Sequence, residues 1–298
     1  MTKPQNVLLR CLSTKLNRKP TKSTPLNSQT NRTGGPEWKH LKPLLPTPKK
    51  QLDGPGRPPI ELREVINGIL YWMRSGCSWS LLPNDYPNSK SVYHYFNTWS
   101  KEGIWQQIHV KLVSKVRKKA DRKKRPTASS IDSQSVKTTQ IGGDERGYDA
   151  GKCIKGRKRF ILVDTLGLLL AVKVVAASVS EKAGAKLLIE KIWANSLLKE
   201  LCGTIEIVWV DAGYQGDDLY DWVANLTGWL WEVVKRSDKL TGFVLLPRRW
   251  VVEPVRRCGS FAWLSFNRRL SKDYEKLTRN SESALYIAML PMMLKRLK

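Results

Sequence analysis

IEIVWVDAGYQG, at residues 205–216, predicts a buried strand that ends in a carboxylate. The first half of this stretch is almost continuously apolar, which is typical of a central strand covered on both faces. Asp211 closes the strand, at the edge of the sheet where ligands bind in open α/β folds. Ala212 and Gly213 follow, so little side-chain bulk lies beside the acid and a phosphate backbone can approach closely.

The segments around this strand predict a mixed sheet with helices on its faces, because a hairpin precedes alternating strands and helices. The hairpin strands are joined by a tight turn at 164–167. In chain order, the expected elements are strands at 128–132, 159–164 and 168–175, a helix at 181–198, a strand at 205–211, a helix at 217–225, a strand at 229–234 and a helical region from about residue 250.

The first half of the chain predicts short helices. Residues 61–75 carry apolar side chains at helical spacing and end at Gly76, which can cap the helix. We expect Ser89 or Ser91 to cap a second helix, and a third to cover 104–116. This pattern resembles a helix-turn-helix module, with Lys90 and Tyr93 as DNA contacts, although any small three-helix bundle gives the same pattern.

Charge indicates the kind of partner. The chain of 298 residues has 52 Lys and Arg against 26 Asp and Glu, a net charge of +26. This excess predicts a polyanion, with nucleic acid favoured over an anionic membrane. No apolar run is long enough to span a bilayer, so no membrane segment is expected. Five scattered cysteines and three histidines argue against disulfide and zinc scaffolds and fit a reducing cytoplasm.

Composition also divides the chain. Residues 1–35 are basic and poor in apolar side chains, so we expect a disordered tail. Residues 36–125 are expected to form the helical DNA-binding domain, whose strongly basic end at 111–125 is either a linker or a helix end directed at phosphates. Residues 126–298 then form the α/β domain.

Three acids are candidate metal ligands. They are Asp132 in SSIDSQSVKT, Asp211, and Glu253 in LPRRWVVEP. Three converging carboxylates can hold one or two Mg²⁺ ions, and two ions about 3.5–4 Å apart support phosphodiester transfer. The alternative is that each acid is structural. Asp164 is a rival candidate, but its position in the tight turn predicts a bond from its side chain to the backbone.

The insert GGDERGYDAGKCIKGRKR, at 142–159, is basic and rich in glycine. It is interpreted either as a loop that lies along DNA phosphates or as a solvated surface loop. Glycine-rich nucleotide motifs are absent, which disfavours nucleotide hydrolysis, and the α/β region has no histidine for a Ser/His/Asp triad. The candidate phosphate contacts of the insert are Lys152, Lys155, Arg157, Lys158 and Arg159.

From about Trp38 to its end, the chain resembles the DDE transposases of bacterial insertion sequences, in the insertion-sequence-five group. The matching stretches are LREVINGILYWMRSGCSWSLLPNDYP, DSQSVKTTQIGGDERGYDAGKCIKGRKRFILVDTLGLLLAV, WVDAGYQG, WEVVKRSD, GFVLLPRRWVVE and FAWLSFNRRLSKDYEKL. The resemblance implies an RNase H-like core preceded by a helix-turn-helix-like region. It further implies that Asp132, Asp211 and Glu253 are the catalytic, metal-binding acids.

The resemblance also implies an activity and its partners. The expected activity is cleavage of the element's terminal inverted repeats in double-stranded DNA and strand transfer to target DNA, with two Mg²⁺ ions for which Mn²⁺ can substitute. A homodimer on DNA, in the bacterial cytoplasm at the nucleoid, is expected. Arg249 matches a family arginine that contacts DNA. Further expected DNA contacts are Lys137, Arg268, Arg269 and Lys272.

One departure from the family leaves a second interpretation open. PVRRCGS separates Glu253 from Phe261, which is about six residues more than relatives carry. Six residues are about 1.7 helical turns, so a helix at this point must loop out the insert or lose its register. The alternative is therefore an impaired transposase relic that only binds DNA.

Overall fold

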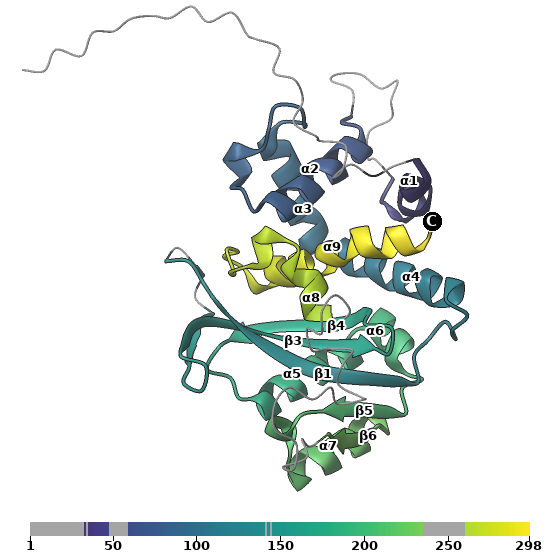
Figure 1. Ribbon diagram of the computed structural model, residues 1–298, viewed down its shortest axis with the longest axis vertical. Coiled ribbons are helices and arrows are strands. Elements are labelled where there is room, and N and C mark those ends of the chain that lie inside the picture. The colour runs from purple at the N-terminus through teal and green to yellow at the C-terminus, as the bar shows by residue number, and fades with distance from the viewer. Residues whose placement is uncertain (1–32, 34, 48–58, 141, 144, 235–259) are drawn as a thin grey trace, which may run out of the picture. The chain divides into compact units, whose positions relative to one another are not determined.

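One mixed sheet organises the described part of the chain, which comprises residues 33, 35–47, 59–140, 142–143, 145–234 and 260–298 of a computed structural model (Figure 1). All the predicted strands are confirmed. The first continues to Lys137 instead of ending at Asp132, the second begins at Ile154 instead of Arg159, and a short unpredicted strand lies between them. The strands are β1 (Ala128–Lys137), β2 (Gly147–Asp149), β3 (Ile154–Asp164), β4 (Leu169–Ala176), β5 (Ile207–Val210) and β6 (Leu230–Val233).

Strand order places β1 at the centre of the sheet. β3 runs antiparallel to β1, β2 and β4, while β5 runs parallel to both β1 and β6. The resulting order is β4-β3-β1-β5-β6, with β2 paired to the part of β3 that precedes its pairing with β4. An antiparallel hairpin followed by parallel strands is the arrangement expected of an RNase H-like sheet.

The helices differ from the sequence prediction in where they begin and end. The helix expected at 181–198 is divided at Asn195, whose side chain accepts a hydrogen bond from the Leu198 backbone and so starts a new helix. The helices are α1 (Gly35–Leu41), α2 (Leu62–Ser75), α3 (Ser89–Lys101), α4 (Ile104–Lys119), α5 (Glu181–Ala194), α6 (Ser196–Cys202), α7 (Asp217–Thr227), α8 (Ser260–Ser265) and α9 (Thr278–Arg296).

Caps explain where the helices α2 and α3 begin and end. Gly76 adopts a left-handed conformation, with φ of 72°, and ends α2 as predicted. The prediction that Ser89 or Ser91 caps α3 is wrong, because the side chain of Asn88 accepts the hydrogen bond from the Lys90 backbone. Asparagine one residue earlier satisfies the same free backbone donor.

The C-terminal helix connects the helical region to the sheet. α9 contacts both α4 and β4, and Figure 1 shows α4 and α9 on one side of the sheet and α5 on the other. His109 of α4, which is fully buried, bonds through Nε2 to the Leu169 carbonyl of β4 at 2.6 Å. The helical region and the sheet therefore share buried contacts. No described helix is long and apolar enough to span a membrane.

Candidate active site

The register of two parallel strands brings two of the predicted acids together. In the β1–β5 pair, Ala128 lies beside Ile207 and Ser130 beside Trp209. Continuing this register by two residues places Asp132 beside Asp211. Since paired strands lie about 4.8 Å apart, the two carboxylates start from neighbouring backbone positions.

Local backbone contacts fix both carboxylates. The Ser133 N–H donates to Oδ1 of Asp132 at 2.6 Å, and the Gly213 N–H donates to Oδ1 of Asp211 at 2.9 Å. The second bond starts the 3₁₀ turn η4 (Ala212–Tyr214) directly after β5. A Cβ at position 213 would lie 3.1 Å from Oδ1 of Asp211, so glycine keeps the space beside this acid open.

A third carboxylate, Glu181, lies beside this pair. The Ser133 hydroxyl donates to Oε1 of Glu181 at 3.4 Å. A Cβ built on Gly213 would lie 3.4 Å from Cγ of Glu181, so the glutamate also borders the turn that carries Asp211. Sequence reasoning treated Glu181 only as a helix start. One signal in the sequence was the position of Glu181 directly after Ser180, which caps α5. This helix follows β4, and β4 runs parallel to β1, the strand that carries Asp132.

Tyr214 is completely buried, and its hydroxyl lies close enough to these acids to be affected by their charges. Burial raises the pKa of its hydroxyl well above the ordinary value, and the charges of Asp132, Asp211 and Glu181 raise it further. The Ser133 side chain acts in the opposite direction and lowers this pKa, although it makes no hydrogen bond of standard geometry with the Tyr214 hydroxyl. Tyr214 therefore remains protonated beside the carboxylates.

The described acids fit part of a divalent-metal site. Asp132 and Asp211 offer the hard oxygen ligands that Mg²⁺ and Mn²⁺ prefer. The third predicted ligand, Glu253, lies outside the described residues, as do Arg249 and the insert at 254–259. Within the described ranges, no group of three or more Asp, Glu, His or Cys side chains is arranged to hold a metal ion.

The rival acid Asp164 has a structural role, as its position in the turn predicted. Its Oδ1 accepts hydrogen bonds from the backbone N–H groups of Leu166 and Leu168, at 2.9 and 2.8 Å. Its other oxygen is paired with Arg117 of α4, and both side chains are buried. Burial raises the pKa of Asp164, while Arg117 opposes that effect.

Comparison with known proteins assigns the chain to a family. A model of the transposase DDE domain matches residues 123–290, more than half of the chain, and a model of the transposases of the IS4/5 family matches residues 35–109. The chain belongs to the IS4/5-type DDE transposases. An uncharacterized 16.2 kDa protein of insertion element IS402 from Burkholderia cepacia is 32% identical over 108 residues, which cover 35% of this chain and 72% of that relative. No solved structure matches the chain.

In this transposase, the prediction that Arg157, Lys158 and Arg159 lie on a solvent-facing loop is wrong. All three are in β3 and are at most 3% exposed. Arg159 donates to the carbonyls of Leu270 and Lys272 at 2.9 and 3.3 Å, which anchors the C-terminal segment to the sheet. Because buried cations require internal partners, these side chains stabilise the fold and are not exposed to contact DNA.

Arg157 makes the densest set of internal contacts. Its guanidinium carries five donors in a fixed plane, which suits a cluster of buried acceptors. The acceptors and distances are Glu145 O at 2.9 Å, Asp273 Oδ1 at 3.3 Å, Glu275 O at 2.7 Å, Lys276 O at 2.8 Å and Ser281 Oγ at 3.2 Å.

Arg269 is also held inside the transposase, contrary to its predicted contact with DNA phosphates. Its guanidinium donates to Oε1 of Glu275 at 2.7 Å and lies over the rings of Trp72 and Tyr274, 4.7 Å from each centroid. The side chain thereby joins α2 to the C-terminal segment. A planar cation between two rings and a carboxylate is a structural contact.

The remaining predicted DNA contacts among the described residues are at the surface. The exposed cations lie on the β1–β3 hairpin, in the C-terminal segment and at the start of α3, where Tyr93 is 40% exposed. A hollow of about 370 Å³ lies among Lys137, Arg146, Tyr148 and Lys155 of the hairpin. The exposed predicted contacts are Lys90, Tyr93, Lys137, Lys152, Lys155, Arg268 and Lys272.

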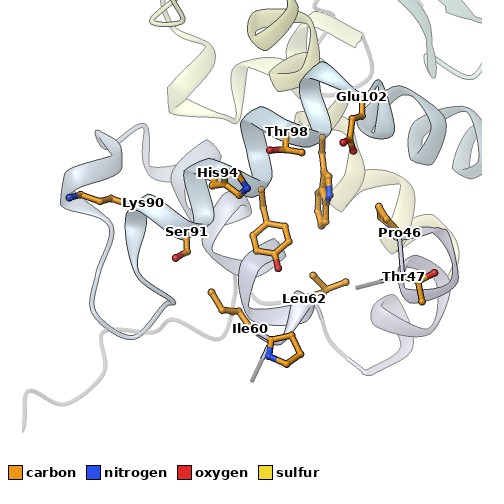
Figure 2. Close-up of a pocket in the computed structure, with 12 residues that line it drawn as sticks. Pro46, Thr47, Ile60, Leu62, Lys90, Ser91, His94, Thr98 and Glu102 are labelled. Atoms are coloured by element: carbon orange, nitrogen blue, oxygen red, sulfur yellow. The ribbon is translucent and has the colours of Figure 1, made fainter. Parts of the chain in front are cut away.

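A cavity of about 630 Å³ beside α3 is separate from the acids. Figure 2 shows His94 and Thr98 of α3 together with Ile60 and Leu62 around it. Its lining is mainly apolar and, among the described residues, holds a single carboxylate, Glu102. It therefore does not provide the paired oxygen ligands that phosphodiester chemistry requires.

Proposed function

We propose that this transposase binds the terminal inverted repeats of its element as double-stranded DNA, cleaves their strands and joins the resulting 3′-hydroxyl to target DNA. Asp132 and Asp211, completed by Glu253, would hold two Mg²⁺ ions, and Mn²⁺ would substitute. The observation that carries the proposal is the β1–β5 register, which pairs Ser130 with Trp209 and, continued by two residues, places Asp132 beside Asp211.

The residues present have separate tasks in this proposal. Divalent ions at the acids supply the charge that activates the attacking oxygen and stabilises the leaving oxygen. Asp132 and Asp211 hold their own carboxylates in place through the bonds from Ser133 and Gly213. The absence of a side chain at Gly213 leaves room for a phosphate beside Asp211. Buried Tyr214 stays protonated and so adds no negative charge beside the acids.

The surface of the hairpin supports binding to the DNA backbone. Lys137, Lys152 and Lys155 are exposed there, and lysines that contact phosphates release counterions from the DNA. Lys90 and Tyr93 on α3 are proposed to face the terminal repeat. Pairing of two element ends would require a homodimer, acting on nucleoid DNA in the bacterial cytoplasm.

The insert after Glu253 supports a second candidate, an impaired transposase that binds DNA without cutting it. Binding does not separate the two candidates, because phosphate contacts give strong affinity with or without catalysis. Cleavage of a labelled duplex carrying the terminal repeat does separate them, in Mg²⁺ or Mn²⁺.

That assay compares the parent chain, Asp132→Asn and a variant that lacks residues 254–259. Nicking by the parent that is lost in Asp132→Asn supports the active enzyme. Nicking only by the deletion variant identifies a relic that the insert has disabled. If neither the parent nor the deletion variant nicks the duplex, although both bind DNA tightly, the proposed catalysis is contradicted.

A further inference from the structure

A buried lysine lies behind the acid pair. Lys158 of β3 is 3% exposed, and its Nζ donates to the Val179 carbonyl at 2.9 Å and to Oε1 of Glu181 at 3.1 Å. Asp149 Oδ2 is 3.5 Å from the same nitrogen. A buried ammonium is costly unless it is paired, so these two carboxylates account for its position. Lys158 consequently holds the Glu181 carboxylate at one defined place.

The backbone of Glu181 is fixed independently of this ion pair. Ser180 caps α5 by accepting a hydrogen bond from the Ala183 N–H at 3.3 Å. One turn along, Gly184 lies so close to β3 that a Cβ there would be 2.0 Å from Cζ of Phe160. This close approach sets the distance between α5 and the sheet. The first turn of α5 also favours an acidic side chain such as Glu181 through the helix dipole.

From this position, Glu181 reaches both segments that carry the proposed ligands. Its Oε1 accepts from the Ser133 hydroxyl at 3.4 Å, and the Ser133 backbone N–H holds Asp132. Its Cγ borders Gly213, whose backbone N–H holds Asp211. One side chain thus contacts the residue next to the first acid and the turn after the second.

We propose that Glu181 is a positioning residue that holds Ser133 and the Gly213 turn so that Asp132 and Asp211 face a shared metal site, with Lys158 fixing Glu181 in turn. This inference rests on the proposed function of the two aspartates as ligands. Oε1 of Glu181 is already engaged by Lys158 and Ser133, which fits an indirect role better than ligation. Outer partners of this kind orient ligands and tune metal affinity.

Binding of Mn²⁺ to the full-length protein, followed by electron paramagnetic resonance of free Mn²⁺, tests this inference without requiring cleavage. Glu181→Ala is expected to weaken Mn²⁺ binding about 10-fold, the usual cost of removing an outer partner. Glu181→Gln keeps an oxygen acceptor for Ser133 and is expected to recover most of that loss. Glu190→Gln, an exposed acid on the same helix, is the matched control and should bind as the parent does. Asp132→Asn should lose binding.

Each other outcome has a definite meaning. Parental affinity in Glu181→Ala, together with loss in Asp132→Asn, overturns the positioning role and leaves the proposed function intact. Equal losses in Glu181→Ala and Glu181→Gln also overturn it, because they assign the effect to charge alone. Mn²⁺ binding that is unchanged in Asp132→Asn overturns both the positioning role of Glu181 and the proposed function of the aspartates as ligands. Circular dichroism of Glu181→Gln, which preserves the hydrogen bond, confirms that the comparison is made on folded protein.

Discussion

Replacing Arg157 with alanine is expected to destabilise the transposase strongly in the absence of DNA. The side chains of Arg157 and Asp273 are at most 1% exposed, so the substitution leaves a buried carboxylate without its cation. Loss of one partner from a buried pair costs about 3–5 kcal/mol. The backbone carbonyls that accept from the guanidinium also lose a donor, which places the expected loss at the upper end of that range.

Urea unfolding followed by tryptophan fluorescence measures this loss, and a thermal scan should show a fall of the melting temperature on the order of 10 °C. Lys155→Ala is the matched control, because Lys155 is an exposed cation two positions away on the same strand. Its unfolding free energy should stay within about 0.5 kcal/mol of the parent. If Arg157→Ala were as stable as Lys155→Ala and only lost DNA affinity, Arg157 would be a surface phosphate contact and the reasoning would be refuted.

Three further predictions concern pH, packing and DNA binding. Burial lowers the pKa of His109 to about 4, so the folded state binds fewer protons than the unfolded state below pH 6.5. The free energy of unfolding, measured by urea titration, should therefore fall by about 3 kcal/mol from pH 6.5 to 4. A His109→Gln variant whose stability falls as steeply would contradict this. Gly184→Ala should lower the free energy of unfolding by about 1–3 kcal/mol, because the added methyl group clashes with Phe160. Phe160→Leu in the same chain should recover part of this loss, whereas strictly additive losses would rule out the clash. Lys155→Ala should reduce the salt dependence of DNA binding, measured by anisotropy, by about one unit of slope, and an unchanged slope would exclude its phosphate contact.

Local patterns in the sequence predicted the strands of the sheet but not where the strand that carries Asp132 ends. Both acids were expected at strand ends. Asp211 directly follows β5, but the expectation for Asp132 is wrong, because β1 continues past it to Lys137. The relative position of the two acids followed only from the β1–β5 register, continued by two residues beyond Ser130 and Trp209. The division at Asn195 was missed because apolar periodicity continues through it, while a side-chain cap interrupts the helix.

Contacts distant in sequence explain what local patterns did not predict. Five basic residues in a short glycine-rich stretch are typical of a solvated surface, yet the Asp273 partner of Arg157 lies 116 positions later in the chain. Glu181 was missed for the same reason, since its role depends on Lys158 and on the close contact between Gly184 and β3. Such contacts exist only after the sheet and α5 have packed together.

The proposed ligand role of Asp132 and Asp211 is tested most directly by replacing each with cysteine and measuring cleavage of a terminal-repeat duplex in different metals. Thiolate is a poor ligand for Mg²⁺ and a better one for softer ions. We predict that Asp132→Cys and Asp211→Cys lose cleavage in Mg²⁺ and regain part of it in Mn²⁺, whereas Glu181→Cys shows no such selective rescue. Full cleavage by either aspartate variant in Mg²⁺ would contradict the account, because that aspartate would then not bind the metal.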